Sequence, residues 1–246
     1  MEKKAYNVYS GHLPFESKLR RQLMVAANSL AISLEGNQDP VGKFYYLNKA
    51  LSIAQSQADL KTDDVANIHN NIGVSYWEES LYEAALSNLQ AALALWRARV
   101  PVDSNQLAVT YNNLALVHES LHQLPEALAD YQAALQYLTG QSDAKGRSTQ
   151  ASILNNLSFV YQTMGQFTQA IHCRKAALEL EELVYGLGSV QVAKFRSSLG
   201  SILSESRNFQ RAEACFASAE QSFLELGLAQ SLDRATNCLF LERTLC

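Results

Sequence analysis

Apolar and small residues recur at spacings of three and four along most of this 246-residue chain. Between residues 72 and 92, one such stripe contains Ile72 and Tyr76, and the next contains Ala85, Leu89 and Ala92. This spacing places each stripe on one face of an α-helix. It predicts helices over residues 15–35, 41–57, 63–79, 82–99, 104–121, 124–138, 148–164, 167–185, 189–206 and 209–225, and a last one over 229–244.

Residues that favour helix ends stand between these segments. Pro40 and Pro125 each lie at the expected start of a helix, where a missing N–H group costs nothing. Asp103 and Ser148 are expected N-caps, because a short oxygen-bearing side chain can accept a hydrogen bond from the first helical turn. Gly186 is expected to end a helix. These residues at helix ends therefore agree with an all-α chain of short helices.

Asparagine pairs reveal a repeat within this pattern. Asn71, Asn113 and Asn156 are each the second member of an Asn-Asn pair, and they are 42 and 43 residues apart. Two alanine tracks keep the same period: Ala85, Ala127, Ala170 and Ala212, then Ala92, Ala134, Ala177 and Ala219, the latter extending back to Ala50. Small residues at Gly73, Ala115, Ser158 and Gly200 would let paired helices approach closely. A fixed period of this length is the signature of stacked helix pairs.

The repeated positions resemble the tetratricopeptide repeat (TPR), whose pattern sets a small residue, an aromatic, an Ala, a large residue and an Ala at fixed spacing. The second helix pair has Gly73, Tyr76, Ala85, Leu89 and Ala92 there. The 42-residue length and the segments "NNLALVHE" and "AALELEELVYGLGSVQVA" are similar to the long repeats of kinesin light chains. The resemblance covers roughly residues 60–225, and it implies a right-handed superhelical α-solenoid.

We accordingly expect a single domain over residues 1–246, built from five helix pairs. A degenerate first repeat spans 15–57, with Lys43 in place of the usual Ala. Full repeats follow over 63–99, 104–138, 148–185 and 189–225, and the helix over 229–244 is expected to cap the array. Terminal units of such arrays are usually atypical because one of their faces lacks a neighbour.

The first helix of each pair is expected to line the concave side of the solenoid. At about 100° per residue, a stripe opposite the packed face points into the groove. The stripe consists of Asn67, Asn71, Val74, Asn113, Leu116, Ser152, Asn156, Phe159, Lys194 and Ser198. An amide offers both a donor and an acceptor, so Asn71, Asn113 and Asn156 could hold the backbone of an extended peptide. Val74, Leu116 and Phe159 would then supply apolar pockets beside this Asn ladder.

A purely structural role for the amides is the alternative. Asn70, Asn112 and Asn155 lie on a flank of their helices and are expected to bond to the adjacent helix. They and Trp77 remain further candidates for ligand contact. The Lys-rich carboxylate clamp of some TPR proteins is missing, because Asn70, Val74, Asn113, Ser152 and Asn156 occupy its positions. Binding of an acidic C-terminal tail is therefore disfavoured.

Composition and charge narrow the range of partners. The net charge is −4 and the isoelectric point is about 5.8, which argues against nucleic-acid binding. No apolar run approaches the ~18 residues of a membrane span, and no signal peptide is apparent, so we expect a cytoplasmic protein. The four cysteines lack zinc-site spacing, and "HESLH" from His118 to His122 lacks further ligands. We expect no metal and no cofactor.

The sequence thus predicts a non-catalytic protein–protein interaction module that binds a peptide or an extended partner segment in its groove. A regulatory receptor for a short signalling peptide is an alternative, as is an enzyme whose site carries no known motif. A self-associating scaffold is a further alternative, with contact between copies through the C-terminal helix. The N-terminal segment "AYNVYSGHLPF" could also occupy the groove of its own chain.

Overall fold

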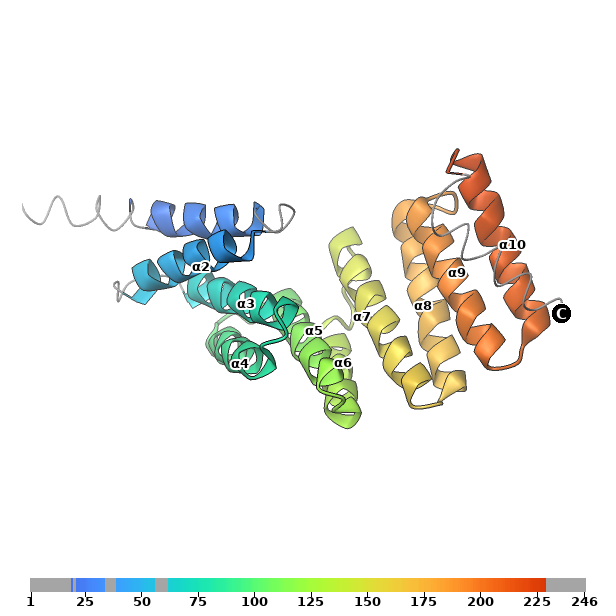
Figure 1. Ribbon diagram of the computed structural model, residues 1–246, viewed down its shortest axis with the longest axis horizontal. Helices are drawn as coiled ribbons and strands as arrows, with labels where there is room; N and C mark the ends of the chain where they lie inside the picture. The colour runs from blue at the N-terminus through green and yellow to red at the C-terminus, as the bar shows by residue number, and fades with distance from the viewer. Residues whose placement is uncertain (1–18, 20, 34–38, 56–61, 229–246) are drawn as a thin grey trace, which may run out of the picture. The chain divides into compact units, whose positions relative to one another are not determined.

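The computed structural model describes residue 19 and residues 21–33, 39–55 and 62–228 (Figure 1). All regular structure in these residues is α-helical. Residues 21–33 form the first helix, and the later ones are α2 (Pro40–Gln55), α3 (Thr62–Glu78), α4 (Tyr82–Ala98), α5 (Ser104–Ser120), α6 (Leu124–Tyr137), α7 (Ala144–Thr163), α8 (Phe167–Tyr185), α9 (Val190–Glu205) and α10 (Phe209–Glu225). The predicted helix over 229–244 and the N-terminal segment lie outside the described residues.

Most helices begin and end within two residues of the predicted positions, but α7 does not. It begins at Ala144, because the Asp143 side chain accepts a hydrogen bond from the N–H of Gly146 at 3.0 Å. The expected N-cap at Ser148 is therefore wrong, and that residue lies inside the helix. Asp103 does cap α5, accepting from the N–H of Gln106 at 3.1 Å.

The chain divides into two compact units, Met1–Leu121 and His122–Cys246, and each is described here by itself. The first unit contains the helix over 21–33 and α2 to α5, and the second contains α6 to α10. The predicted third repeat thus has its first helix in one unit and its second helix in the other. A single domain over the whole chain and one continuous superhelix remain predictions.

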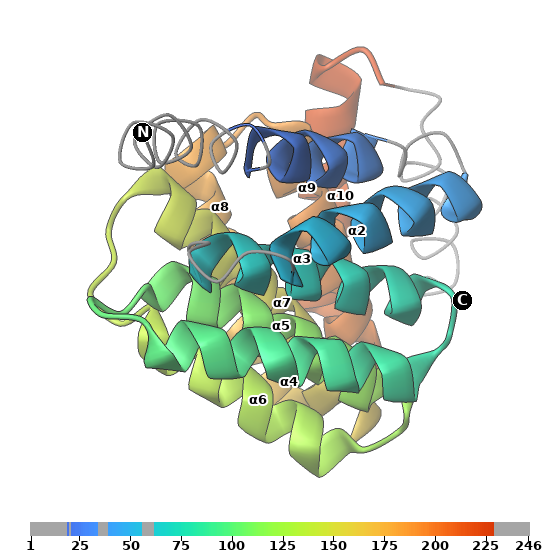
Figure 2. The same ribbon diagram turned by 90° about the vertical axis from the view of Figure 1, so that its left-hand side faces the viewer.

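The core of the first unit lies between its helix pairs. Met24 and Ala31 of the first helix pack with Leu47 and Ala50 of α2 and with Ile72 of α3. Figure 2 shows these three helices next to one another. Gly73 is buried where α3 crosses α4, and a Cβ atom there would lie 2.6 Å from Cγ of Leu89. The glycine therefore permits the close approach that the small-residue track predicts.

The second unit repeats this packing with different side chains. Gly200 of α9 lies against the ring of Phe216 of α10, where an added Cβ would come within 2.7 Å of a ring carbon. Leu203 and Ala212 complete this cluster, and Ala193, Ala219 and Phe223 form another one farther along the same two helices. The tracks of small residues thus lie in the core of both units.

The turn after the first helix of each of the four full repeats has a recurrent conformation. Ser80, His122, Gly165 and Arg207 all have positive φ angles, of 60°, 58°, 72° and 60° respectively. These four positions follow the 42- to 43-residue period, although only one of them is the glycine that such a conformation favours. The period therefore extends to the backbone of the turns.

Candidate functional site

The asparagine pairs connect neighbouring first helices in the first unit. Asn71 of α3 donates from Nδ2 to Oδ1 of Asn28 in the first helix at 2.9 Å. Asn113 of α5 donates in the same way to Oδ1 of Asn70 in α3 at 3.0 Å. All four side chains are half-buried. We call this row of contacts, made by Asn28, Asn70, Asn71 and Asn113, the amide seam.

In the amide seam, the two members of the asparagine pair of α3 bond to different neighbours. In α3, Asn70 accepts from the following repeat, whereas Asn71 donates to the preceding one. One amide thus serves each neighbour, and a helix that lies between two others needs both. Asn28 was missed by the sequence analysis because the residue after it is Ser29, so it belongs to no pair. Its position 42 residues before Asn70 was the signal that could have found it.

Other polar contacts join the same helices along the seam. Arg21 of the first helix pairs with Asp64 of α3 through Nε and Oδ2 at 2.7 Å. Two turns beyond the amides, Nε1 of Trp77 donates to Oγ of Ser120 at 2.8 Å. Trp77 is therefore a half-buried flank residue with a defined hydrogen-bond partner.

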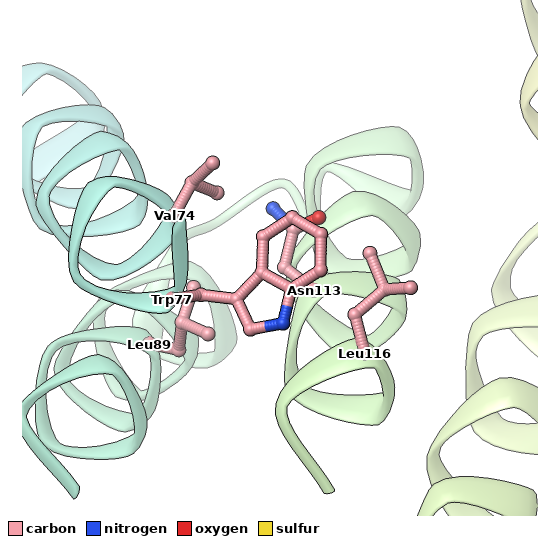
Figure 3. A pocket seen from close by; sticks show the side chains of 5 residues that line it. All are labelled: Val74, Trp77, Leu89, Asn113 and Leu116. Atoms are coloured by element: carbon pink, nitrogen blue, oxygen red, sulfur yellow. The ribbon is translucent and has the colours of Figure 1, made fainter. Parts of the chain in front are cut away.

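A small apolar pocket opens beside the amide seam. It is lined by Val74 and Trp77 of α3, Leu89 of α4, and Asn113 and Leu116 of α5 (Figure 3). Its empty space is about 210 Å³, part of which is open to solvent. The indole of Trp77 extends from α3 toward α5, and Leu116 lies on the far side of it (Figure 3). We call this the Trp77 pocket.

A second depression lies between the first helix and α3. Met24, Val25, Asn28, Asp64, Asn67 and Ile68 line it, with about 370 Å³ of empty space that includes open solvent. Apolar and polar side chains contribute to the wall, among them the amides of Asn28 and Asn67. The predicted groove residues of the first unit are thus divided between this depression, the amide seam and the Trp77 pocket.

The remaining predicted site residues belong to the second unit. Ser152 and Lys194 are exposed, Phe159 is 50% exposed, and Asn156 and Ser198 are half-buried. Asn155 donates from Nδ2 to Oδ1 of Asn156 at 3.2 Å. The ten groove residues are therefore placed within two separate units, and one groove through both remains a prediction.

Asn155 also binds a buried charge. The Nη1 group of Arg174 in α8 donates to Oδ1 of Asn155, and its guanidinium lies 5.9 Å from the ring centre of Phe195. Only 6% of Arg174 is exposed, and burial lowers its pKa to about 10, so it remains cationic at neutral pH. Asn155 thus bonds to the adjacent helix of its own repeat, whereas a bond between repeats, of the kind expected for these residues, is made by Asn70.

Glu181 of α8 is a buried ionisable residue with a carboxyl oxygen that lacks a hydrogen-bond partner in the described part of the chain. It lies two helical turns after Arg174 with 2% exposure, and its Oε2 has no hydrogen-bond partner among the described residues. Burial raises the pKa of its carboxyl group above the usual value. The folded state thus favours the protonated acid, and its contribution to stability is lost as the pH rises through the raised pKa.

We expect Glu181→Gln to stabilise the protein at alkaline pH. The neutral amide removes the cost of ionising a buried group, so the free energy of unfolding should rise by about 1 kcal/mol at pH ~8 and by much less at pH ~5. Urea unfolding followed by circular dichroism at the two pH values measures this difference. The control is Glu179→Gln, an exposed neighbour on α8. An equal effect of both variants would contradict the expectation.

The described residues contain no group of three or more His, Cys, Asp or Glu side chains that could hold a metal ion. Cys173 and Cys215 are unpaired thiols, and burial raises the pKa of both. Within the same residues, no helix has the length and apolar character needed to cross a bilayer.

Solved structures with the same fold come from proteins of diverse role. A putative kinesin light chain of Podosopora anserina has a TM-score of 0.70 at 12% identity, over 84% of this chain and 97% of that one. Aspartyl phosphate phosphatase F from Bacillus subtilis has a TM-score of 0.75 at 15% identity, over 95% of this chain and 61% of that one. The Rap conjugation gene regulator of plasmid pLS20, solved with a Phr peptide, has a TM-score of 0.63 at 17% identity, over 88% of this chain and 62% of that one.

At these identities the likeness shows the fold alone. No curated protein matches the sequence. The model of the tetratricopeptide repeat matches residues 64–139 and 149–225, which is more than half of the chain. These two segments contain the amide pairs, both alanine tracks and the Trp77 pocket. The chain therefore belongs to the tetratricopeptide repeat family.

Proposed function

We propose that this chain is a non-catalytic, cytoplasmic interaction module that binds an extended segment of a protein or peptide along its first helices. The observation that carries the proposal is the Trp77 pocket, in which apolar side chains of three helices lie beside an amide. A peptide needs both features, because its side chains are often apolar while its backbone is always polar. Solved TPR folds include a complex with a peptide, which supports this class of partner.

The amide seam changes how the Asn ladder would work. The bond to Asn70 uses one of the two N–H groups on Nδ2 of Asn113, and the second group can donate to a ligand carbonyl. In this proposal the seam holds Asn113 in a fixed orientation at the edge of the pocket. The peptide backbone binds along the amides, while an apolar side chain lies against the Trp77 pocket. Asn71 has the same arrangement one repeat earlier.

The test uses the full chain and peptides selected from a random library displayed on phage. We expect selected peptides to share an apolar residue, and Leu116→Glu to weaken their binding at least about tenfold, because a carboxylate in an apolar pocket must be desolvated. Trp77 lines the pocket, so its fluorescence should change on binding, whereas Trp96 is 2% exposed and distinct from it. Isothermal titration calorimetry gives the affinities.

A matched control is Leu183→Glu, which adds the same charge at a 67% exposed leucine of α8. Binding should be unchanged in this variant. Peptides that bind Leu116→Glu as tightly as the wild type, with Trp77 fluorescence unaffected, would refute the assignment. Circular dichroism of each variant shows that the helices are retained.

A regulatory receptor for a short signalling peptide is the second candidate. It is favoured by the solved regulator whose structure contains such a peptide. A receptor of this kind should change shape on binding, so small-angle scattering should show compaction with a free peptide of a few residues. A scaffold should bind longer segments and show little change in its radius of gyration.

A further inference from the structure

The first helix has an exposed apolar stripe that the proposed groove does not use. Leu19, Leu23 and Leu30 are 45%, 52% and 41% exposed, and Ala26 between them is also exposed. Met24 and Ala31 of the same helix point into the core, so the stripe lies on a different side of the helix. Three half-exposed leucines on one short helix are unusual for a surface that only meets water.

The spacing of the stripe is that of a helix–helix seam. Leu19, Leu23, Ala26 and Leu30 follow one another at intervals of four, three and four residues, which is the a/d pattern of a coiled coil. Two such helices can pair with opposite directions so that Leu19 meets Leu30 of a second copy. In that register Leu23 meets Ala26, so a large side chain faces a small one. The stripe is therefore complementary to itself.

The charge of this helix also permits self-pairing. Arg21 is the one charged side chain among residues 21–33, and it is engaged by Asp64 of α3 at 2.7 Å. The positions beside the stripe are Gln22, Ser29 and Ser33. Within residues 21–33, two copies of this face can approach without repulsion between like charges.

We propose that the first helix is a homodimer interface, in which the stripe Leu19, Leu23, Ala26 and Leu30 packs antiparallel on the same stripe of a second copy. One helix from each copy forms an interface at or below the ~1,200 Å² of stable complexes, so the dimer is weak and forms at micromolar concentrations. The contact is separate from the Trp77 pocket, so each copy keeps its own binding site. The dimer would display two such sites.

The experiment is sedimentation velocity of the full chain from about 1 µM to about 500 µM, a range that covers weak dimers. The wild type is expected to shift from monomer to dimer across it. An acidic variant (Leu19→Glu with Leu30→Glu) and a basic variant (Leu19→Lys with Leu30→Lys) should each weaken self-association at least about 100-fold, because each buries unpaired charge. Mixing the two should restore a dimer, because the antiparallel register places each acid opposite a lysine.

The control is Val41→Glu, which adds a charge at a 79% exposed apolar residue of α2 outside the stripe and should dimerise like the wild type. Circular dichroism establishes that each variant is folded. A wild type that remains monomeric throughout would overturn the proposal, and would leave the chain's own residues 1–18 as the alternative cover for the stripe. A dimer that survives both charge variants, or folded variants that do not associate when mixed, would overturn it as well.

Discussion

Gly73→Val should destabilise the first unit by about 3 kcal/mol, at the upper end of the usual cost of overpacking. A valine Cβ would lie 2.6 Å from Cγ of Leu89 and 3.2 Å from the backbone oxygen of Ala85, so α3 and α4 would have to separate. Replacing a helical glycine normally stabilises a helix by up to about 1 kcal/mol. A decrease in the free energy of unfolding would therefore show that close packing outweighs helix propensity here. Both tryptophans of the chain, Trp77 and Trp96, lie in this unit, so urea unfolding followed by tryptophan fluorescence reports on it directly.

Gly188→Val, in the turn before α9, is the control for this substitution, and its unfolding is followed by far-UV circular dichroism because the second unit contains no tryptophan. Nothing lies within 4 Å of a Cβ built on Gly188, so its effect should stay within about 0.5 kcal/mol.

A double-mutant cycle tests whether Gly73 and Leu89 interact directly. Gly73→Ala and Leu89→Ala should be less harmful together than the sum of their separate effects, because the added methyl group fills space that the shortened side chain leaves. Additive effects would show that the two residues do not limit the approach of the helices.

Arg174→Ala should destabilise the second unit by about 3 kcal/mol. The substitution removes a long buried side chain, which leaves a cavity next to Phe195 and deprives Asn155 of its donor. Arg174→Met should cost less than about 1 kcal/mol, since methionine fills a similar volume and does not require a buried charge to be desolvated. Urea unfolding followed by far-UV circular dichroism compares the two variants.

The exposed neighbour Lys175 provides the control for this comparison. Lys175→Ala removes a charge and a flexible side chain at the next position of α8, and it should change stability by no more than about 0.5 kcal/mol. If Arg174→Met were as harmful as Arg174→Ala, the charge itself would be essential. The bond to Asn155 would then contribute more than the packing of the side chain.

The helices could be predicted from the sequence because each has an unambiguous apolar stripe and clear end signals. The predicted bounds of α8 and α10, 167–185 and 209–225, are those found in the structure. The start of α7 was misplaced because the Ser148 side chain can also cap a helix, whereas Asp143 is the residue that accepts from the first turn, at Gly146. The positive φ angles at Ser80 and Arg207 gave no sequence signal, since neither residue favours that conformation.

The candidate site was predictable in part. The repeat period identified the helix faces, and Val74, Trp77, Asn113 and Leu116 do come together in one pocket. The hydrogen-bond partners were harder to predict, because they depend on how far one helix slides along the next. Asn71 reaches Asn28 across 43 residues, one more than the usual repeat length, and no composition or spacing rule sets that offset. How the two units combine into one groove remains a prediction for the same reason.

Asn70 and Asn71 belong to two different junctions, so the repeat that contains α3 carries an acceptor for the following repeat and a donor for the preceding one. Duplication of a whole unit in the gene would then yield a longer array whose new joint is already complete. Loss of that unit would likewise leave an amide acceptor on the preceding repeat and an amide donor on the following one. Arrays of this type can therefore change length in evolution, or in the laboratory, without redesign of the joints.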